Sequence, residues 1–169
     1  MKNIDKSIAA FSIAIFFLMT LARFANAQTQ EDVGAQVQAM WSANNITQLN
    51  TYLQGLLTSS PDYAPAVVAG AFYDFIFLGK LNDAKAKLLR VSGAAQSNPQ
   101  TYPETFTTSL SATITEVNDE IRIQTAHGKS EQDWQTNANP QAVKNAVGTN
   151  TFPIIELIMA TPKVSLPSQ

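Results

Sequence analysis

The stretch "FLGKLNDAKAKLLRV", residues 77–91, decides the fold of this chain. An aromatic run ends at Gly79, and a pattern typical of an amphipathic helix follows it. The preceding stretch "APAVVAGAFYDFIFL", residues 64–78, is apolar nearly all round and is predicted to be a helix that is covered on several sides. The sequence therefore predicts a helical hairpin that turns at Gly79, which raises the question of whether a second one exists.

An equivalent hairpin precedes it. Apolar residues at helical spacing predict one helix over about 31–43 and another from Ile46 to the "SSPD" of 59–62, where proline cannot continue a helix. A shift of 35 positions, the distance from Ile46 to Leu81, superimposes the inner faces of the two hairpins. It carries Val33, Val37, Met40, Trp41, Ile46, Leu49, Leu53 and Leu56 onto Val68, Phe72, Phe75, Ile76, Leu81, Ala84, Leu88 and Val91. We therefore expect an all-α fold of tandem antiparallel helical hairpins, a short α-solenoid.

The second hairpin resembles a tetratricopeptide repeat (TPR). Four positions carry the resemblance, namely the aromatic residue of the first helix, the turn glycine, and the small and large residues of the second helix: Phe75, Gly79, Ala84 and Leu88. Phe72 departs from the family pattern, because a small residue usually stands there. The resemblance covers about residues 31–91 and implies a scaffold that binds a protein or peptide partner.

The remainder of the chain continues the helical pattern without continuing the repeat. Apolar spacing predicts a longer helix over about 103–126, and Asn139-Pro140 begins a short helix that ends at Gly148. The segment "SEQDWQTNA" between them is expected to be a loop or a short turn of helix. Residues 152–160 fit either a short helix or a buried strand, and we favour a helix that packs on the end of the array.

The N-terminus has the layout of a secretory signal peptide. Lys2 and Lys6 precede an apolar stretch of 15 residues, Ile8 to Ala22, and the triplet Ala25-Asn26-Ala27 offers a cleavage site. The stretch is shorter than the roughly 20 residues that a membrane-spanning helix needs. We therefore expect residues 1–27 to be a signal peptide and the product to be periplasmic or extracellular, with a retained N-terminal anchor as the alternative.

The rest of the chain is then divided simply. Residues 28–162 are expected to form a single helical domain without a transmembrane segment, and residues 163–169 a disordered tail. Without the leader, the chain keeps 8 basic and 12 acidic residues, a net charge of −4, which argues against a nucleic-acid binder. The sequence has no cysteine and one histidine, His127, so it offers no thiol nucleophile, no cysteine or histidine metal cluster and no Ser-His-acid triad. We expect no cofactor.

Two groups of residues are candidates for partner binding. Lys80, Lys85, Lys87 and Arg90 are the one basic concentration in an acidic chain and are predicted to form a patch for a peptide carboxylate or an anionic lipid head. Trp134 lies outside the strong periodicity and is predicted to be an exposed anchor. Simple solvent exposure is the alternative for the basic residues.

Two further hypotheses remain open beside the scaffold. Glu116 and Glu120 lie one helical turn apart and would suit a hard cation or an acid–base pair, although such a run is more often a solvated face. The apolar stretches 66–78 and 152–159 exceed what a thin two-layer array buries, which favours a carrier that encloses a small apolar ligand or lipid between them. The sequence thus predicts a partner-binding scaffold, with a ligand carrier as the alternative and a carboxylate enzyme as the third hypothesis.

Overall fold

A computed structural model describes residues 33–148 and 152–167. The expected signal peptide 1–27 therefore lies outside the described residues. The described chain is all-α, as predicted, and its elements are the helices α2 (Val33–Ser42), α3 (Ile46–Ser59), α4 (Ala64–Tyr73), a π-helical turn η1 (Asp74–Leu78), α5 (Leu81–Ser97), α6 (Glu104–Ala126), α7 (Glu131–Asn137), α8 (Pro140–Val147) and α9 (Pro153–Ala160). Among these helices, none combines the length and the apolar content that crossing a bilayer requires.

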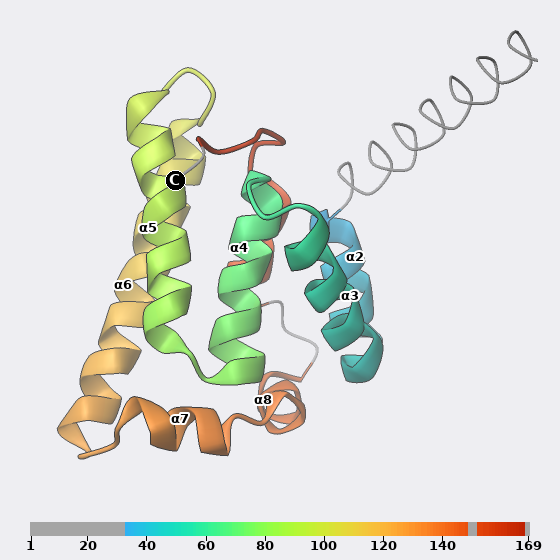
Figure 1. Cartoon of the computed structure of the whole chain (residues 1–169), viewed down its shortest axis with the longest axis vertical. Helices are drawn as coiled ribbons and strands as arrows, with labels where there is room; N and C mark the ends of the chain where they lie inside the picture. The colour runs from blue at the N-terminus through green and yellow to red at the C-terminus, as the bar shows by residue number, and fades with distance from the viewer. Residues whose placement is uncertain (1–32, 149–151, 168–169) are drawn as a thin grey trace, which may run out of the picture. The chain divides into compact units, whose positions relative to one another are not determined.

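Two helical hairpins form the centre of the structure. Helix α2 packs against α3, α4 packs against α5, and α3 joins the two pairs by packing on α4 (Figure 1). The chain reverses at Asn44 and Gly79, which both have left-handed backbone angles, φ 57° and φ 63°. The predicted inner faces are buried, with the exception of the half-buried Ile46 and Phe75. The helical spacing of apolar residues thus placed this core correctly.

The predicted helix over 64–78 changes its winding before it ends. Residues 74–78 form a π-helical turn, and the N–H groups of Gly79 and Lys80 both donate to the carbonyl of Asp74. A π-turn is wider than an α-helical turn and is often found at functional sites. Here it forms the end of the helix from which Phe75 and Ile76 project.

Helix α9 confirms the helical reading of 152–160, so the strand alternative is wrong. It buries Ile154, Ile155, Leu157 and Ile158, and it packs against α2, α4 and α6. The prediction placed this helix only on the end of the array, whereas α9 also packs against α2, the first helix of the array. Gly34 permits this approach, since a Cβ there would lie 2.6 Å from the Cα of Met159.

The C-terminal segment corrects another expectation. Residues 163–167, predicted to belong to a disordered tail, pack against the α3–α4 turn, where Leu166 is 4 % exposed. The N–H of Leu166 donates to the carbonyl of Asp62 at 2.7 Å, and Arg90 donates to the carbonyl of Pro167 at 3.0 Å. These long-range bonds hold a segment whose own composition favours disorder.

Helices α7 and α8 follow the end of α6 and run beneath the α4–α5 turn in Figure 1. Helix α7 begins with a capping box, in which the side chains of Ser130 and Asp133 each accept a backbone N–H of the other residue. Helix α8 starts at the predicted Asn139-Pro140 and ends at Gly148, which has φ 65°. Helix α7 has no buried residue, and α8 has one, Lys144.

Candidate functional site

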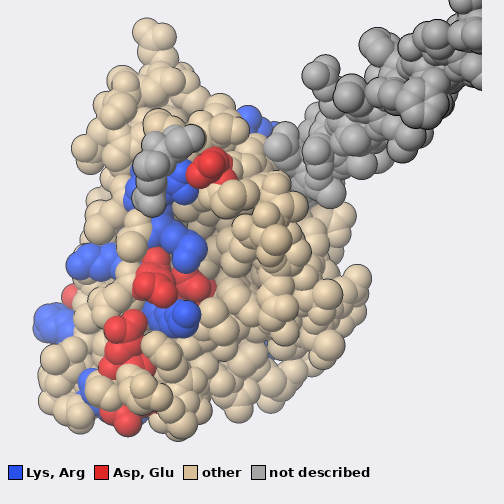
Figure 2. Space-filling view, viewed as in Figure 1, with Lys and Arg blue, Asp and Glu red and all other residues tan. Residues whose placement is uncertain are grey.

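The predicted basic patch lies on α5, but acidic residues offset most of its charge. Lys87 forms an ion pair with the buried Asp74, and Arg90 forms one with Asp62. Lys80 lies 3.9 Å from the carboxylate of Asp83, whereas Lys85 has no partner among residues 33–148 and 152–167. Figure 2 shows acidic and basic side chains interleaved on this face of the molecule. The structure therefore gives α5 a mixed surface instead of a free cationic patch.

Trp134 is less exposed than predicted. The residue is half-buried, and its indole Nε1 is buried without a hydrogen-bond partner in the described chain. Its carbonyl oxygen would lie 2.5 Å from a Cβ at Gly79. The absence of a side chain at Gly79 is therefore what lets α7 lie directly against the α4–α5 turn.

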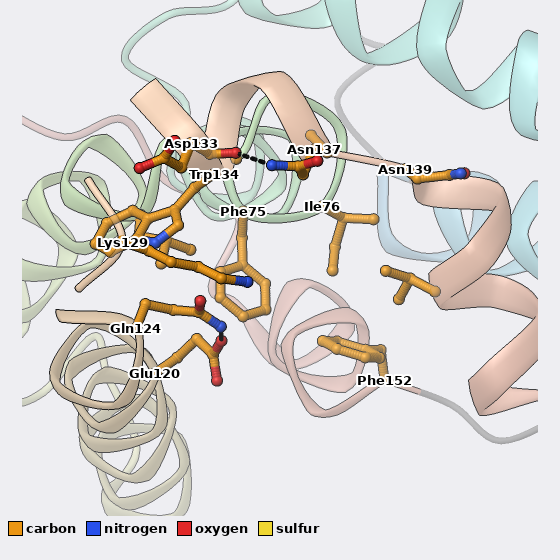
Figure 3. A pocket seen from close by; sticks show the side chains of 14 residues that line it. Phe75, Ile76, Glu120, Gln124, Lys129, Asp133, Trp134, Asn137, Asn139 and Phe152 are labelled. Carbon is orange, nitrogen blue, oxygen red and sulfur yellow. Dashed lines mark hydrogen bonds between the residues drawn. The ribbon is translucent and has the colours of Figure 1, made fainter. Parts of the chain in front are cut away.

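Beside this contact lies a cavity of about 410 Å³, bordered by η1, α6, α7 and α8 (Figure 3). Its apolar lining comes from Phe75, Ile76, Leu81, Trp134, Val143 and Phe152. Its polar lining comes from Glu120, Gln124, Lys129, Asp133, Asn137 and Asn139. Apolar walls with a few polar groups, at a volume between about 300 and 1,000 Å³, are typical of small-molecule sites.

The aromatic walls come from distant parts of the chain. Phe75 projects from the π-turn, and Phe152 precedes α9, with a ring-to-ring distance of 6.2 Å. Both rings are half-buried, so each presents part of its surface to the cavity. The pocket therefore touches both apolar stretches between which a ligand was predicted, at the end of the first stretch and at the beginning of the second. Along the rest of their length the two stretches leave no room for a ligand, because α4 and α9 pack directly together.

Among the polar side chains of the lining, which we call the rim, Asp133 and Asn139 cap helices α7 and α8. Asp133 accepts hydrogen bonds from the hydroxyl and the N–H of Ser130, and these bonds lower the pKa of Asp133. The side chain of Asn139 accepts the N–H of Ala142 at 3.0 Å. Asn137 donates to the carbonyl of Asp133 at 2.6 Å. These groups fix the shape of the rim.

Glu120 is bound differently. Its Oε1 accepts a hydrogen bond from Nε2 of Gln124, one turn further along α6. Within the described chain Glu120 has no basic partner, because the acidic members of the ion pairs are Asp62, Asp74, Asp83 and Asp119. A half-buried carboxylate therefore faces the pocket with its charge uncompensated by an ion pair.

The other predicted carboxylate does not join this site. Glu116 borders a separate cavity of about 260 Å³ between α6 and α9, together with Glu156. Groups of three or more acidic or histidine side chains able to hold a metal ion do not occur in residues 33–148 and 152–167. His127 is exposed at the end of α6. Glu116 also borders a small cavity of about 20 Å³ together with Phe75 and Phe152, so it lies near the same aromatic side chains without lining the larger cavity.

Sequence reasoning missed the pocket and most of its lining, including Phe152, Gln124 and Lys129. The useful signal was the pair of Gly79 and Trp134, a turn glycine and an aromatic residue outside the periodicity, but their proximity is not encoded in any spacing. Comparison with known proteins finds no matching family model, no matching curated protein and no matching solved structure, so the site has to be interpreted from its own residues.

Proposed function

We propose that this chain is an exported, non-catalytic helical binding protein whose pocket takes a small and largely apolar ligand. The observation that carries the proposal is the cavity of about 410 Å³ with aromatic walls and a polar rim. The rim side chains that cap α7 and α8 are held in place, which favours recognition of a defined shape. The proposed site differs from the one in the carrier hypothesis, because the pocket lies beside the Gly79 turn and not between α4 and α9.

Export is supported by the leader pattern of residues 1–27. Full-length protein expressed in its source cell is expected to yield a shorter product that begins at Gln28 and lies outside the cytoplasm. Cell fractionation with N-terminal sequencing checks this. A cytoplasmic product that keeps Met1 would refute export without touching the pocket.

The ligand proposal is tested by filling the cavity. Val143 is half-buried and lines the pocket, so Val143→Phe places a ring in the ligand's space. Val147→Phe, one turn further on the same helix and outside the pocket lining, is the matched control. Native mass spectrometry of protein purified without detergent is expected to show a bound small mass in the wild type and in the control, and to show it reduced in Val143→Phe.

The outcomes separate clearly. Loss of the bound mass in both variants would point to a general effect on folding, which circular dichroism detects. Unchanged bound mass in Val143→Phe, or a wild type free of any co-purifying mass that also fails to bind a panel of small apolar probes, would overturn the carrier proposal.

A protein or peptide partner is the second candidate, as the TPR resemblance implies. One observation favours it: Leu89 is 47 % exposed, and it lies one turn from the unpaired Lys85 on the outer face of α5. A partner that docks there is expected to bind Lys85→Glu/Leu89→Asp less well than the wild type. The control is Ser111→Asp on the exposed side of α6, and equal binding by all three proteins would refute this surface.

A further inference from the structure

We propose that the ligand of this pocket carries a protonated amine, which Glu120 binds while the aromatic walls enclose the apolar body. The inference rests on the proposed function, because it assigns a ligand class to the same cavity. Its starting point is the charge that the lining leaves unbalanced.

Three charged side chains border the cavity: Glu120, Lys129 and Asp133. None of the three belongs to an ion pair in the part of the chain that the structure describes. Two carboxylates and one ammonium group give the lining one net negative charge. Asp133 already accepts two hydrogen bonds from Ser130, whereas Glu120 accepts one, from Gln124, so Glu120 is the less satisfied of the two carboxylates.

The hydrogen bond from Gln124 prepares Glu120 for this role. It engages Oε1, whereas Oε2 has no hydrogen-bond or ion-pair partner among residues 33–148 and 152–167. Figure 3 shows the side chains of Glu120 and Gln124 extending from α6 toward the space beside the ring of Phe75. A carboxylate that is held at one oxygen and free at the other is suited to accept a hydrogen bond from an ammonium group.

The walls favour a cation as well. Phe75, Trp134 and Phe152 all line the cavity, and the faces of aromatic rings attract an ammonium group within about 6 Å. The same rings provide the apolar surface that the rest of the ligand needs. An anionic ligand would meet the carboxylates of Glu120 and Asp133, which outnumber the one ammonium group of Lys129, and a neutral one would cover the Glu120 charge without pairing it.

Three probes that share a phenethyl body and differ in the head group test the inference: phenethylamine, phenethyl alcohol and hydrocinnamate. Isothermal titration calorimetry on the wild type is expected to give a dissociation constant for the amine that is at least about tenfold lower than for the alcohol, as a charge-assisted hydrogen bond predicts. Hydrocinnamate is expected to bind most weakly.

Two variants locate the effect. Glu120→Gln keeps the size of the side chain and is expected to remove the preference for the amine. Glu104→Gln at the exposed start of the same helix is expected to keep it, because Glu104 does not line this pocket. Circular dichroism confirms that both variants are folded. A preference that survives Glu120→Gln, or disappears in Glu104→Gln, would overturn the role of Glu120.

The failure of this inference is distinguishable from the failure of the carrier function. Equal binding of the amine and the alcohol, or tighter binding of hydrocinnamate, overturns the amine and leaves the pocket standing. Binding of none of the probes also overturns the amine at this size. The co-purified mass and its loss in Val143→Phe then decide whether the pocket binds a ligand at all.

Discussion

Helix α4 continues through η1 to the pocket, and helix α7 borders the pocket directly, but the two helices are held in the structure in different ways. All ten residues of α4 are buried, between α3, α5 and α9, whereas α7 has no buried residue. Helix α4 therefore contributes to the hydrophobic core, and α7 contributes a wall to the cavity. The core and the lining of the pocket are thus supplied largely by different parts of the chain.

The α7–α8 segment is attached by a few defined contacts. The backbone of Trp134 lies against Gly79, and Asn82 donates to Glu131 at 3.2 Å. Lys144 lies with its Nζ 5.0 Å from the ring centroid of Trp41. Because little apolar surface is buried here, we expect this segment to open at a lower free energy than the hairpins.

The largest expected effect comes from the core. Phe72 is fully buried and meets the ring of Trp41 edge-on at 5.6 Å. Phe72→Ala is expected to lower the free energy of unfolding by about 3–5 kcal/mol. Urea unfolding followed by circular dichroism measures it. The same truncation at the half-buried Trp134 should cost clearly less, and equal costs would abolish the contrast between the two regions.

The second prediction concerns the contact between the regions. Gly79→Ala introduces a Cβ at φ 63° and against the Trp134 carbonyl, so we expect a loss of about 2–4 kcal/mol together with weaker ligand binding. Gly128→Ala is the matched control, because Gly128 has φ 71° but nothing within 4 Å of the added atom. The control should lose only about 1–2 kcal/mol. Similar losses in both would mean that the α7 contact contributes little.

The third prediction concerns the buried ion pair. Asp74 is 5 % exposed, and Lys87→Met leaves its carboxylate without a cation. Because about a third of the Lys87 side chain is exposed, solvent screening reduces the expected loss to about 1–2 kcal/mol. The double variant Asp74→Asn/Lys87→Met should recover most of it. A double variant as unstable as the single one would contradict a pairing role.

Asp74 also predicts a pH dependence. Burial raises its pKa above the ordinary value of 3.8, more than Lys87 lowers it, so the folded state holds this proton more tightly than the unfolded chain. The stability due to protonated Asp74 is complete below pH 3.8 and is lost as the pH rises through the folded-state pKa. Relative to Asp74→Asn, the wild type should therefore lose stability as the pH is raised from below 3.8. Urea unfolding at several pH values checks the sign, and a relative gain would refute it.

The smallest expected effect is confined to α7. Ser130→Ala removes the N-cap hydrogen bond to Asp133 and is expected to cost about 1 kcal/mol or less. Amide hydrogen exchange should accelerate within Glu131–Asn137 and stay unchanged in α4. Ser111→Ala, at an exposed position inside α6, is the control. Acceleration that spreads into α4 would mean that the two regions open as one unit.

The part of the fold that could be predicted is the part that the local spacing of apolar residues encodes. Apolar residues three and four apart identified the buried faces of α3 and α5, and the turn residues Asn44 and Gly79 marked where the hairpins reverse. The C-terminal segment was missed because its partners, Asp62 and Arg90, lie far away in the sequence. An alternation of apolar and polar residues from Val164 to Leu166 was the available signal for an extended, packed segment.

The site was less predictable than the fold. The sequence identified four basic residues by composition, but it did not show that Asp62 and Asp74 would neutralise two of them. Glu120 was singled out for its spacing from Glu116, whereas its surroundings, not its spacing, distinguish it. Residues that act together in this pocket come from separate helices, and a period of 3.6 relates residues only within one helix.

The contact between Gly79 and the backbone of Trp134 has a consequence for how the sequence around the pocket can evolve. Main-chain atoms are common to all residue types, so replacements on the cavity side of α7 need not shift the wall that carries them. The shape of the pocket can therefore be conserved while the lining side chains, and with them the ligand that the pocket favours, change during evolution. Gly79 itself is the exception, because any larger residue there would push the wall outward.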